Sequence, residues 1–382
     1  MRKWKQISAC CLAAVLAASA PASTVWAVSP EFARTPEEWA RLKDNVMEYE
    51  ELSDLIHEYN TTVQKNQLDI NDKKKDNKIT SDQYAQYYRD AASDARSAMT
   101  GDNPVSDAQS AVAADQADQA ADRNVEDLMV HQLTYDQQEA NLVASAQSSM
   151  VSYFQQTYEL DAARANLEFL EAQYQSALVK QSAGMITQSD VLAARESIQS
   201  AQASIEKLTG SIEETRQKLC IMLGWKYNDS PEIKEIPSID MERIASLNPE
   251  ADREEALANN YTLKINKRKL QNATAEITKS TLNRTISSNE QNINSDLTKN
   301  YQAVLQAKAS YDQSMADFEL ESKNMDTAER KLQIGTLSRL DYLKQKNAFH
   351  SKDFSVKKTQ LDLFQAVQNY YNAVKGLASA GG

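Results

Sequence analysis

Glycine and proline are scarce in this chain, which has eight Gly and seven Pro among its 382 residues. Because these two residue types end or bend helices, their scarcity leaves room for long uninterrupted helices. We find no runs that alternate β-branched or aromatic residues with polar ones, so we predict no clear β-strands. With a charged fraction of 25%, this composition is typical of an all-α protein built from long helices.

Candidate catalytic and metal-binding residues are also few. The three histidines, His57, His131 and His350, stand far apart and lack the spacing of metal ligands. The sequence has no glycine-rich phosphate loop and no nucleophile motif. Only one of the three cysteines, Cys220, lies beyond residue 27, and we expect it to pack inside a helix core. We therefore predict no enzymatic activity, no metal site and no cofactor.

The chain carries a net charge of -12, which argues against nucleic acid as a partner because nucleic acids attract clustered Lys and Arg. Residues 1–27 have the layout of a cleavable secretory signal, in which Arg2 and Lys3 precede an apolar run and a small-x-small site ends at Ala27. No other segment is apolar enough to cross a bilayer. We therefore expect an exported protein of the cell envelope.

One short stretch occurs twice. Residues 184–192 read GMITQSDVL, and 151 residues later residues 335–343 read GTLSRLDYL. The Gly suits the left-handed position that ends a helix, and the Thr or Ser three positions on suits the N-cap of the next helix, with Asp at its third position. Each copy predicts a tight turn between antiparallel helices. The turn residues are Gly184, Met185, Ile186 and Thr187, with Asp190, and Gly335, Thr336, Leu337 and Ser338, with Asp341.

Apolar residues recur every seven positions on both sides of each turn. This spacing predicts long helices that pack as left-handed coiled coils. Because the two copies share one register, the sequence predicts a duplicated, antiparallel helical hairpin. After the turns, the matching positions are Val191, Ile198, Ile205, Ile212 and Leu219 in the first copy and Tyr342, Phe349, Val356, Leu363 and Tyr370 in the second.

Breaks in this pattern divide the mature chain. We expect a first helical repeat over residues 28–224 and a second over residues 250–376, joined by a linker at 225–249 that carries three prolines. The first repeat contains a polar insertion at about residues 65–125, and residues 377–382 are expected to form a flexible tail.

Finer expectations concern individual segments. The first mature helix is expected to begin at Thr35 and to run over residues 35–64. Inside the insertion we expect a charged loop at 69–78, followed by short helices at 84–99 and 108–121. In the second repeat, the polar stretch 284–294 is the expected place of a further hairpin turn.

The paired turns, the Leu223-Gly224 helix end before the linker, and the restart ALANNY at 256–261 together resemble the TolC-like outer-membrane efflux channels. The likeness covers most of residues 125–376. It implies a homotrimer whose helical hairpins pack side by side into a hollow α-helical barrel. It also implies that the two turns form the lower tip of this tube, where a periplasmic adaptor protein engages it and an inner-membrane pump supplies energy.

Carried onto this sequence, the resemblance makes residues 184–187 and 335–338 the candidate adaptor-docking turns. Asp190 and Asp341 are expected to support the helix caps. The alternative is an acidic constriction, in which facing copies in a trimer would raise one another's pKa values.

The sequence departs from this family at the strands that the family inserts in each half. The second half runs from Leu282 to Leu297 without room for them, and the extra residues of the first half are polar and predicted to be helical. The resemblance alone therefore suggests the outer membrane, and whether a bilayer is crossed stays open. Two alternatives remain: an exported coiled-coil spacer without transport activity, and an adaptor subunit, which would carry β-rich modules.

Overall fold

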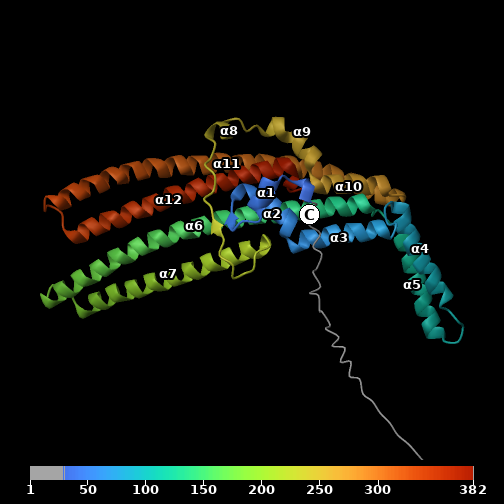
Figure 1. The fold of residues 1–382 in the computed structure, drawn as a ribbon, viewed down its shortest axis with the longest axis horizontal. Coiled ribbons are helices and arrows are strands. Elements are labelled where there is room, and N and C mark those ends of the chain that lie inside the picture. The colour runs from blue at the N-terminus through green and yellow to red at the C-terminus, as the bar shows by residue number, and fades with distance from the viewer. Residues whose placement is uncertain (1–28, 30, 382) are drawn as a thin grey trace, which may run out of the picture.

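The computed structural model describes residue 29 and residues 31–381, so the predicted signal peptide at residues 1–27 lies outside the described part. The molecule is elongated and almost entirely helical (Figure 1). Among the helices of the described residues, none is both long and apolar enough to span a membrane. The all-α fold class is confirmed.

Two long helical hairpins dominate the molecule. The first joins α6 (Leu128–Ser182) to α7 (Gln188–Met222), and the second joins α11 (Glu276–Gln333) to α12 (Arg339–Asn372). With 58 residues, α11 is about 85 Å long. The predicted duplicated hairpin is thus confirmed.

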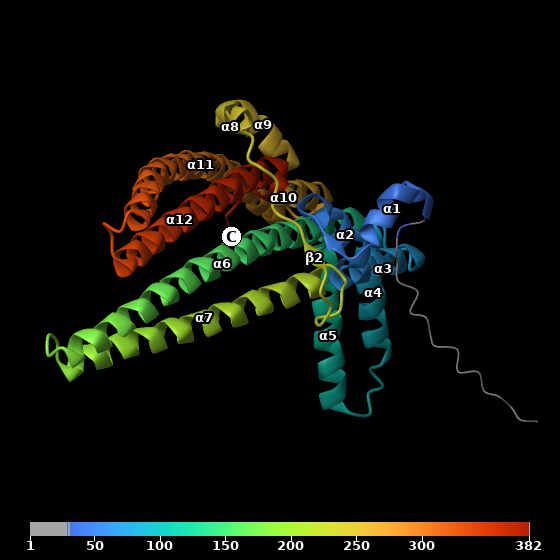
Figure 2. The ribbon, with the colours of Figure 1, turned by 60° about the vertical axis from the view of Figure 1, so that its left-hand side comes forward.

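The four long helices lie side by side in a single layer. Helix α6 contacts both α7 and α12, and α12 contacts α11. The order across the layer is therefore α7, α6, α12, α11, with α7 at one edge and α11 at the other (Figures 1 and 2).

Shorter helices continue the layer beyond the end of α7. In the first repeat, α2 (Leu52–Tyr59) and α3 (Thr61–Lys75) pack against α6. In the second repeat, α9 (Pro249–Asn259) and α10 (Tyr261–Asn272) pack against α11. Each repeat therefore consists of one long hairpin and one pair of short helices.

A buried asparagine stands at the break within each short pair. Asn60 accepts hydrogen bonds from the first N–H groups of α3 and donates one to the carbonyl of Met222 at the end of α7 (2.9 Å). Asn260 accepts an N–H of α10 and donates to the carbonyls of Gly376 (3.3 Å) and Ala378 (2.8 Å) after α12. In both repeats one side chain caps a short helix and holds the end of a long one.

Glycine occupies the matching position after each long hairpin. Gly224 follows α7 with φ +90°, and Gly376, in the helical turn η3 (Ala373–Leu377) after α12, has φ +122°. A Cβ on Gly224 would lie 2.3 Å from the Cβ of Tyr59, and one on Gly376 would lie 2.7 Å from the carbonyl oxygen of Asn259. Both junctions need glycine for the left-handed backbone and for the close approach of the neighbouring segment.

The prediction of one continuous helix over residues 35–64 is wrong. Thr35 does cap a helix, through a complete capping box with Glu38, but the chain leaves the helical conformation after Leu42 and again at Asn60, between α2 and α3. The elements of this segment are η1 (Glu31–Ala33), α1 (Pro36–Leu42), β1 (Val46–Met47) and η2 (Tyr49–Glu51). The extended stretch exists because it has a partner far along the chain.

That partner lies in the linker between the repeats. Strand β1 pairs in parallel with β2 (Glu232–Ile233), and each of these strands is only two residues long. Beyond β2 the linker forms the short helix α8 (Met241–Ala245) before α9 begins at Pro249. The linker therefore ties the second repeat to the N-terminal segment.

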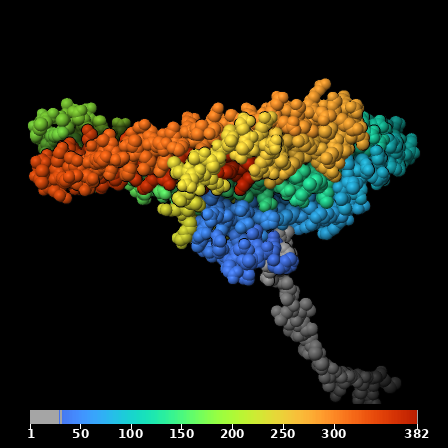
Figure 3. Space-filling model, turned by 90° about the horizontal axis from the view of Figure 1, so that it is seen from above, coloured from blue at the N-terminus to red at the C-terminus, as the bar shows by residue number. Residues whose placement is uncertain are grey.

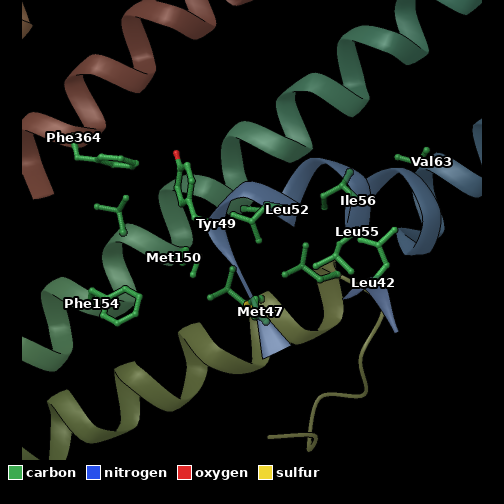
Figure 4. Close-up of a cluster of buried hydrophobic side chains, with 14 of the residues drawn as sticks. Leu42, Met47, Tyr49, Leu52, Leu55, Ile56, Val63, Met150, Phe154 and Phe364 are labelled. Carbon is green, nitrogen blue, oxygen red and sulfur yellow. The ribbon is translucent and has the colours of Figure 1, made fainter. Parts of the chain in front are cut away.

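The core of the first repeat gathers between η2, α2 and the middle of α6 (Figure 4). Met47, Leu52 and Ile56 have no exposed surface there. Tyr49 packs edge-on against Phe364 of α12, with ring centroids 4.9 Å apart. This aromatic contact joins the two repeats through a shared core.

The predicted polar insertion forms a further hairpin, shorter than the two long ones, which we call the arm. It consists of α4 (Ser81–Ser97) and α5 (Pro104–Asp122), close to the two short helices that we predicted. The expected loop at 69–78 is wrong, because α3 continues through the charged stretch to Lys75. Figures 1 and 2 show the arm projecting from the end of the molecule opposite to the turns of the long hairpins.

The second repeat turns earlier than we predicted. A turn at 284–294 is wrong: the chain turns between α10 and α11, and α11 runs through this stretch unbroken. Its polar side chains hold the C-terminal segment, since Asn289 and Asn292 donate to the carbonyl of Ala380 at 2.6 and 3.0 Å. Ala378 and Ala380 are buried. The expected flexible tail is therefore packed against α11.

Replacement of Gly376 by Ala is expected to lower the free energy of unfolding by about 3 kcal/mol, because left-handed strain adds to a clash with a backbone carbonyl. Gly101, in the arm, has φ +84° but open space where a Cβ would stand. Gly101→Ala is therefore expected to lose only about 1 kcal/mol. Denaturant unfolding of the two variants measures the difference, and equal losses would contradict the tight junction.

Candidate functional site

The two repeated turns have the same backbone structure. The N–H groups of Gly184 and Gly335 donate to the carbonyl three residues back, and those of Met185 and Thr336 to the carbonyl five residues back, at 2.9 to 3.0 Å. This pair of bonds is the Schellman motif, which places the first residue in the left-handed region. The φ angles of Gly184 and Gly335 are +70° and +73°. Both helices thus end as the sequence pattern predicts.

The next helix begins at a side-chain cap in both turns. The Thr187 hydroxyl accepts the N–H of Asp190 (3.3 Å), and the Asp190 carboxylate accepts both the N–H (2.8 Å) and the hydroxyl (2.7 Å) of Thr187. Ser338 accepts the N–H of Asp341 (3.1 Å) and donates to its carboxylate (2.7 Å). Hydrogen bonds from Thr187 lower the pKa of Asp190 from its ordinary value. The two aspartates therefore hold the turns rigidly in the single chain.

Apolar side chains are exposed at both turns. Met185 is 72% exposed, and Ile334, which directly precedes Gly335, is 73% exposed. Ile186 and Leu337, one position before each cap, are half-buried. Ile334 was not among the predicted site residues, because the residue at its place in the first copy is an alanine. A search for exposed apolar residues beside each Gly would have found it.

The structure brings the two turns to one end of the molecule (Figures 1 and 3). We call this end the tip. The predicted residues 184–187 and 335–338 all lie there, but on two separate hairpins. Figure 2 shows that the hairpins diverge towards their turns. The tip therefore consists of two similar, separate turns and does not form a single pocket.

The seam between α6 and α12 is polar in the half that leads to the tip. Three side-chain pairs cross it: Gln155 with Asp362 (2.7 Å), Asn166 with Asn347 (3.0 Å) and Glu168 with Lys346 (2.7 Å). The last pair is partly exposed on both sides, and its hydrogen bond lowers the pKa of Glu168. Partly exposed polar pairs exchange readily with water, so this seam holds the two hairpins together only weakly.

Several heptad positions of α7 are incompletely buried. Val191 and Leu219, near the ends of the helix, are 4% and 0% exposed. Ile198, Ile205 and Ile212, between them, are only partly buried in the single chain. The edge helix therefore keeps apolar surface that one hairpin does not cover.

His57 and Cys220 both have structural contacts. No group of three or more His, Cys, Asp or Glu within them is placed to hold a metal ion. His57 contacts Glu139 of α6, with Nδ1 2.8 Å from the carboxylate, and this hydrogen bond raises the pKa of the imidazole. Cys220 is fully buried in α7, as expected for a packing residue.

Comparison with known proteins identifies relatives by structure only. Neither a protein-family model nor a curated protein matches the sequence. Among solved structures, the outer-membrane channel OprN superposes with a TM-score of 0.57 at 13% identity, over 88% of this chain and 92% of that chain.

Two further structures superpose over similar lengths. A membrane protein from Pseudomonas aeruginosa gives a TM-score of 0.56 at 12% identity, over 87% of this chain and 91% of that chain. The outer membrane protein VceC from Vibrio cholerae gives 0.50 at 11% identity, over 86% and 96%. The chain therefore has the fold of outer-membrane channels, and the TolC-like fold that the resemblance implied is confirmed.

The two expectations for Asp190 predict opposite pKa shifts. As a cap partner its pKa lies below the ordinary value of 3.8, so its contribution to stability is present above that value and is lost as the pH falls through the lowered pKa. Thr187→Val should move the pKa back up. NMR titration of the assembled protein measures both. A pKa above 3.8 in the assembly would contradict the cap role and support the acidic constriction.

Proposed function

We propose that this protein is the conduit of an envelope efflux or export system, in which three copies form a hollow helical tube. The fold of outer-membrane channels supports this proposal. The observation that carries it is the single layer of long helices, which has two open edges and incompletely buried heptad positions on α7. A layer of this kind encloses nothing by itself, so a tube requires further copies.

Closure follows from the arrangement of the edges. The layer has α7 at one edge and α11 at the other. When α7 of one copy packs against α11 of the next, every copy makes the same head-to-tail contact, which forms a ring when the rotation between neighbouring copies divides a full turn. Ile198, Ile205 and Ile212 of α7 then become buried. The TolC-like resemblance supports three copies in the ring.

The tip is the proposed docking edge for an adaptor protein of the periplasmic type. Residues 184–187 and 335–338 lie there on rigid Schellman turns, so they present a fixed shape to a partner. Exposed Met185 and Ile334 supply apolar contacts. Exposed apolar side chains held in fixed positions on two hairpins suit a helical partner that inserts between the hairpins.

Transport through the tube would be passive, with energy supplied by an inner-membrane pump behind the adaptor. The polar seam between α6 and α12 is where the tip can open, because its exposed pairs, such as Glu168 with Lys346, lose little when water replaces the partner. Separation of the hairpins at this seam would widen the tube mouth without disturbing the buried cores near α2 and α10.

Export of the chain to the cell envelope forms part of this proposal, as do the signal peptide at 1–27 and the division into repeats at 28–224 and 250–376. Placement at the outer membrane rests on the fold likeness alone. The competing role is an exported coiled-coil spacer, which needs neither a ring nor a docking edge.

Assembly is measured by sedimentation of the mature protein, residues 28–382, at several concentrations. We expect a stable particle of three chains, because only a closed ring covers both edges of every layer. A persistent monomer or an antiparallel dimer would contradict the conduit and favour the spacer.

Docking is tested by a photo-reactive amino acid in place of Met185, introduced in the native cell. We expect cross-links to an adaptor with a helical hairpin, because Met185 stands at the proposed contact edge. The matched control is the same substitution at Met241, which is also exposed but lies in the linker. Equal cross-linking at both positions, or none at Met185, would remove the tip from the docking surface.

A further inference from the structure

The arm has no role in the proposed conduit, yet its charge is unusual. Its residues 81–122 contain eight Asp and two Arg, and no Glu or Lys, which gives a net charge of -6. Half of the chain's total net charge of -12 is therefore carried by this one short hairpin. An exposed hairpin with this imbalance either repels its surroundings or faces a basic surface.

The acids of the two arm helices are used differently. On α5, Asp115 and Asp118 lie near Arg96, and Asp122 lies 3.8 Å from Arg89, so two arginines offset most of the charge of these three aspartates. On the outer side of α4, Asp90 and Asp94 are exposed and take part in no ion pair within the described residues. Asp82 of α4, Asp102 of the connecting loop and Asp107 of α5 also form no ion pair within the described residues, so most of the uncompensated negative charge lies on α4 and at the end of the arm.

The side of α5 that faces away from α4 carries no charge. Val105 is 68% exposed and Val112 56%, and exposed Ala108 and Gln116 complete the same stripe. A solvated helix face normally carries charged residues, so an uncharged, partly apolar stripe indicates packing against another surface.

A basic surface of matching size lies on the same chain, and we call it the shoulder. It comprises α10 and the start of α11, residues 261–285, which contain six Lys or Arg and one Glu. Three of these cations already form ion pairs within the chain, Lys267 with Glu290, Arg268 with Asp127 and Lys269 with Glu126. Lys279 and Arg284 form no ion pair within the described residues. Ile277, between α10 and these two residues, is 79% exposed. The shoulder therefore offers both free positive charge and an apolar point.

The arm and the shoulder of one chain do not cover each other. Only the root of the arm reaches its own α10–α11 turn, where Thr274 donates to the carbonyl of Asp122 (3.3 Å). From there the arm points away from α10 and α11, past the edge of the layer formed by α3 and α7 (Figures 1 and 2). The shoulder lies at the opposite edge, on α11.

We propose that the arm of each copy docks on the shoulder of the next copy in the ring. This inference rests on the proposed tube, in which the α7 edge of one copy meets the α11 edge of its neighbour. The arm extends from the first edge, so it reaches the neighbour's shoulder at the same end of the molecule. Exposed Asp90 and Asp94 face Lys279 and Arg284 of the second copy, and the stripe of α5 covers Ile277.

A second copy fits this surface better than a separate partner does. The stripe offers two valines and small residues, far less than the roughly 1,000 Å² that a free-standing specific interface buries. Inside a ring the neighbouring shoulder is already held nearby, and this high effective concentration makes a small contact sufficient. The opposite charges then select the correct edge and prevent arms from pairing with arms.

Charge exchange tests the contact in the full mature chain. Asp90→Lys with Asp94→Lys in the arm, or Lys279→Asp with Arg284→Asp in the shoulder, should each raise the concentration needed for trimer formation by about tenfold at low salt, because like charges then face each other. The four substitutions together should restore assembly. Glu254→Lys with Glu255→Lys, on exposed α9, is the control with the same change of net charge as the arm pair and should have no effect.

The outcomes separate this inference from the proposed function. A trimer that tolerates the arm and shoulder variants would overturn the docked arm and leave the conduit intact. A parent protein that never forms a trimer would overturn both. Weakened assembly without rescue in the fourfold variant would also overturn the direct contact, since it would show that each change acts separately.

Disulfide trapping gives an independent readout in a Cys220→Ala background. Chains with Val112→Cys are mixed with chains that carry Ile277→Cys, and we expect a mixed dimer after mild oxidation. Val112→Cys chains that instead link to one another would assign the stripe to arm–arm packing and overturn the inference.

Discussion

A layer of helices one helix thick buries each member only against its neighbours, and the two outermost helices keep one side uncovered. This constraint governs the whole molecule. The inner pair, α6 and α12, contact helices on both sides, whereas α7 retains partly buried isoleucines at 198, 205 and 212. Long helices with a seven-residue apolar period need a second seam to cover such positions. The chain therefore forms a single open layer, and the uncovered sides of its two outermost helices are the reason to expect further copies.

Buried contacts hold the layer of helices together near its middle, whereas weaker polar contacts join the two hairpins near the tip. In the middle, Asn60 and Asn260 each connect a short helix to the end of a long one, and Gly224 and Gly376 allow segments to approach within contact distance. Towards the tip, the seam between the repeats carries partly exposed polar pairs in place of a hydrophobic core. Stability thus decreases along the molecule, which allows the hairpin ends to move while the body stays intact.

The parts that the sequence predicted correctly depend on local rules. The turns at Gly184 and Gly335 follow from left-handed glycine, a hydroxyl cap and an aspartate within a few residues. The parts that failed depend on distant partners. Strand β1 extends because β2 is available in the linker, the polar stretch around Asn289 remains helical because the C-terminal segment lies against it, and Ile334 became notable only through its exposure. The heptads and the docking role of the tip remain predictions.

End-on images of the assembled mature protein by electron microscopy test the central claim most directly, because they report whether the layer closes around empty space. The account predicts a three-fold ring with a continuous central lumen, and with the Gly184 and Gly335 turns of all copies at one end. A filled helical bundle, an open sheet of chains, or particles with tips at both ends would contradict it.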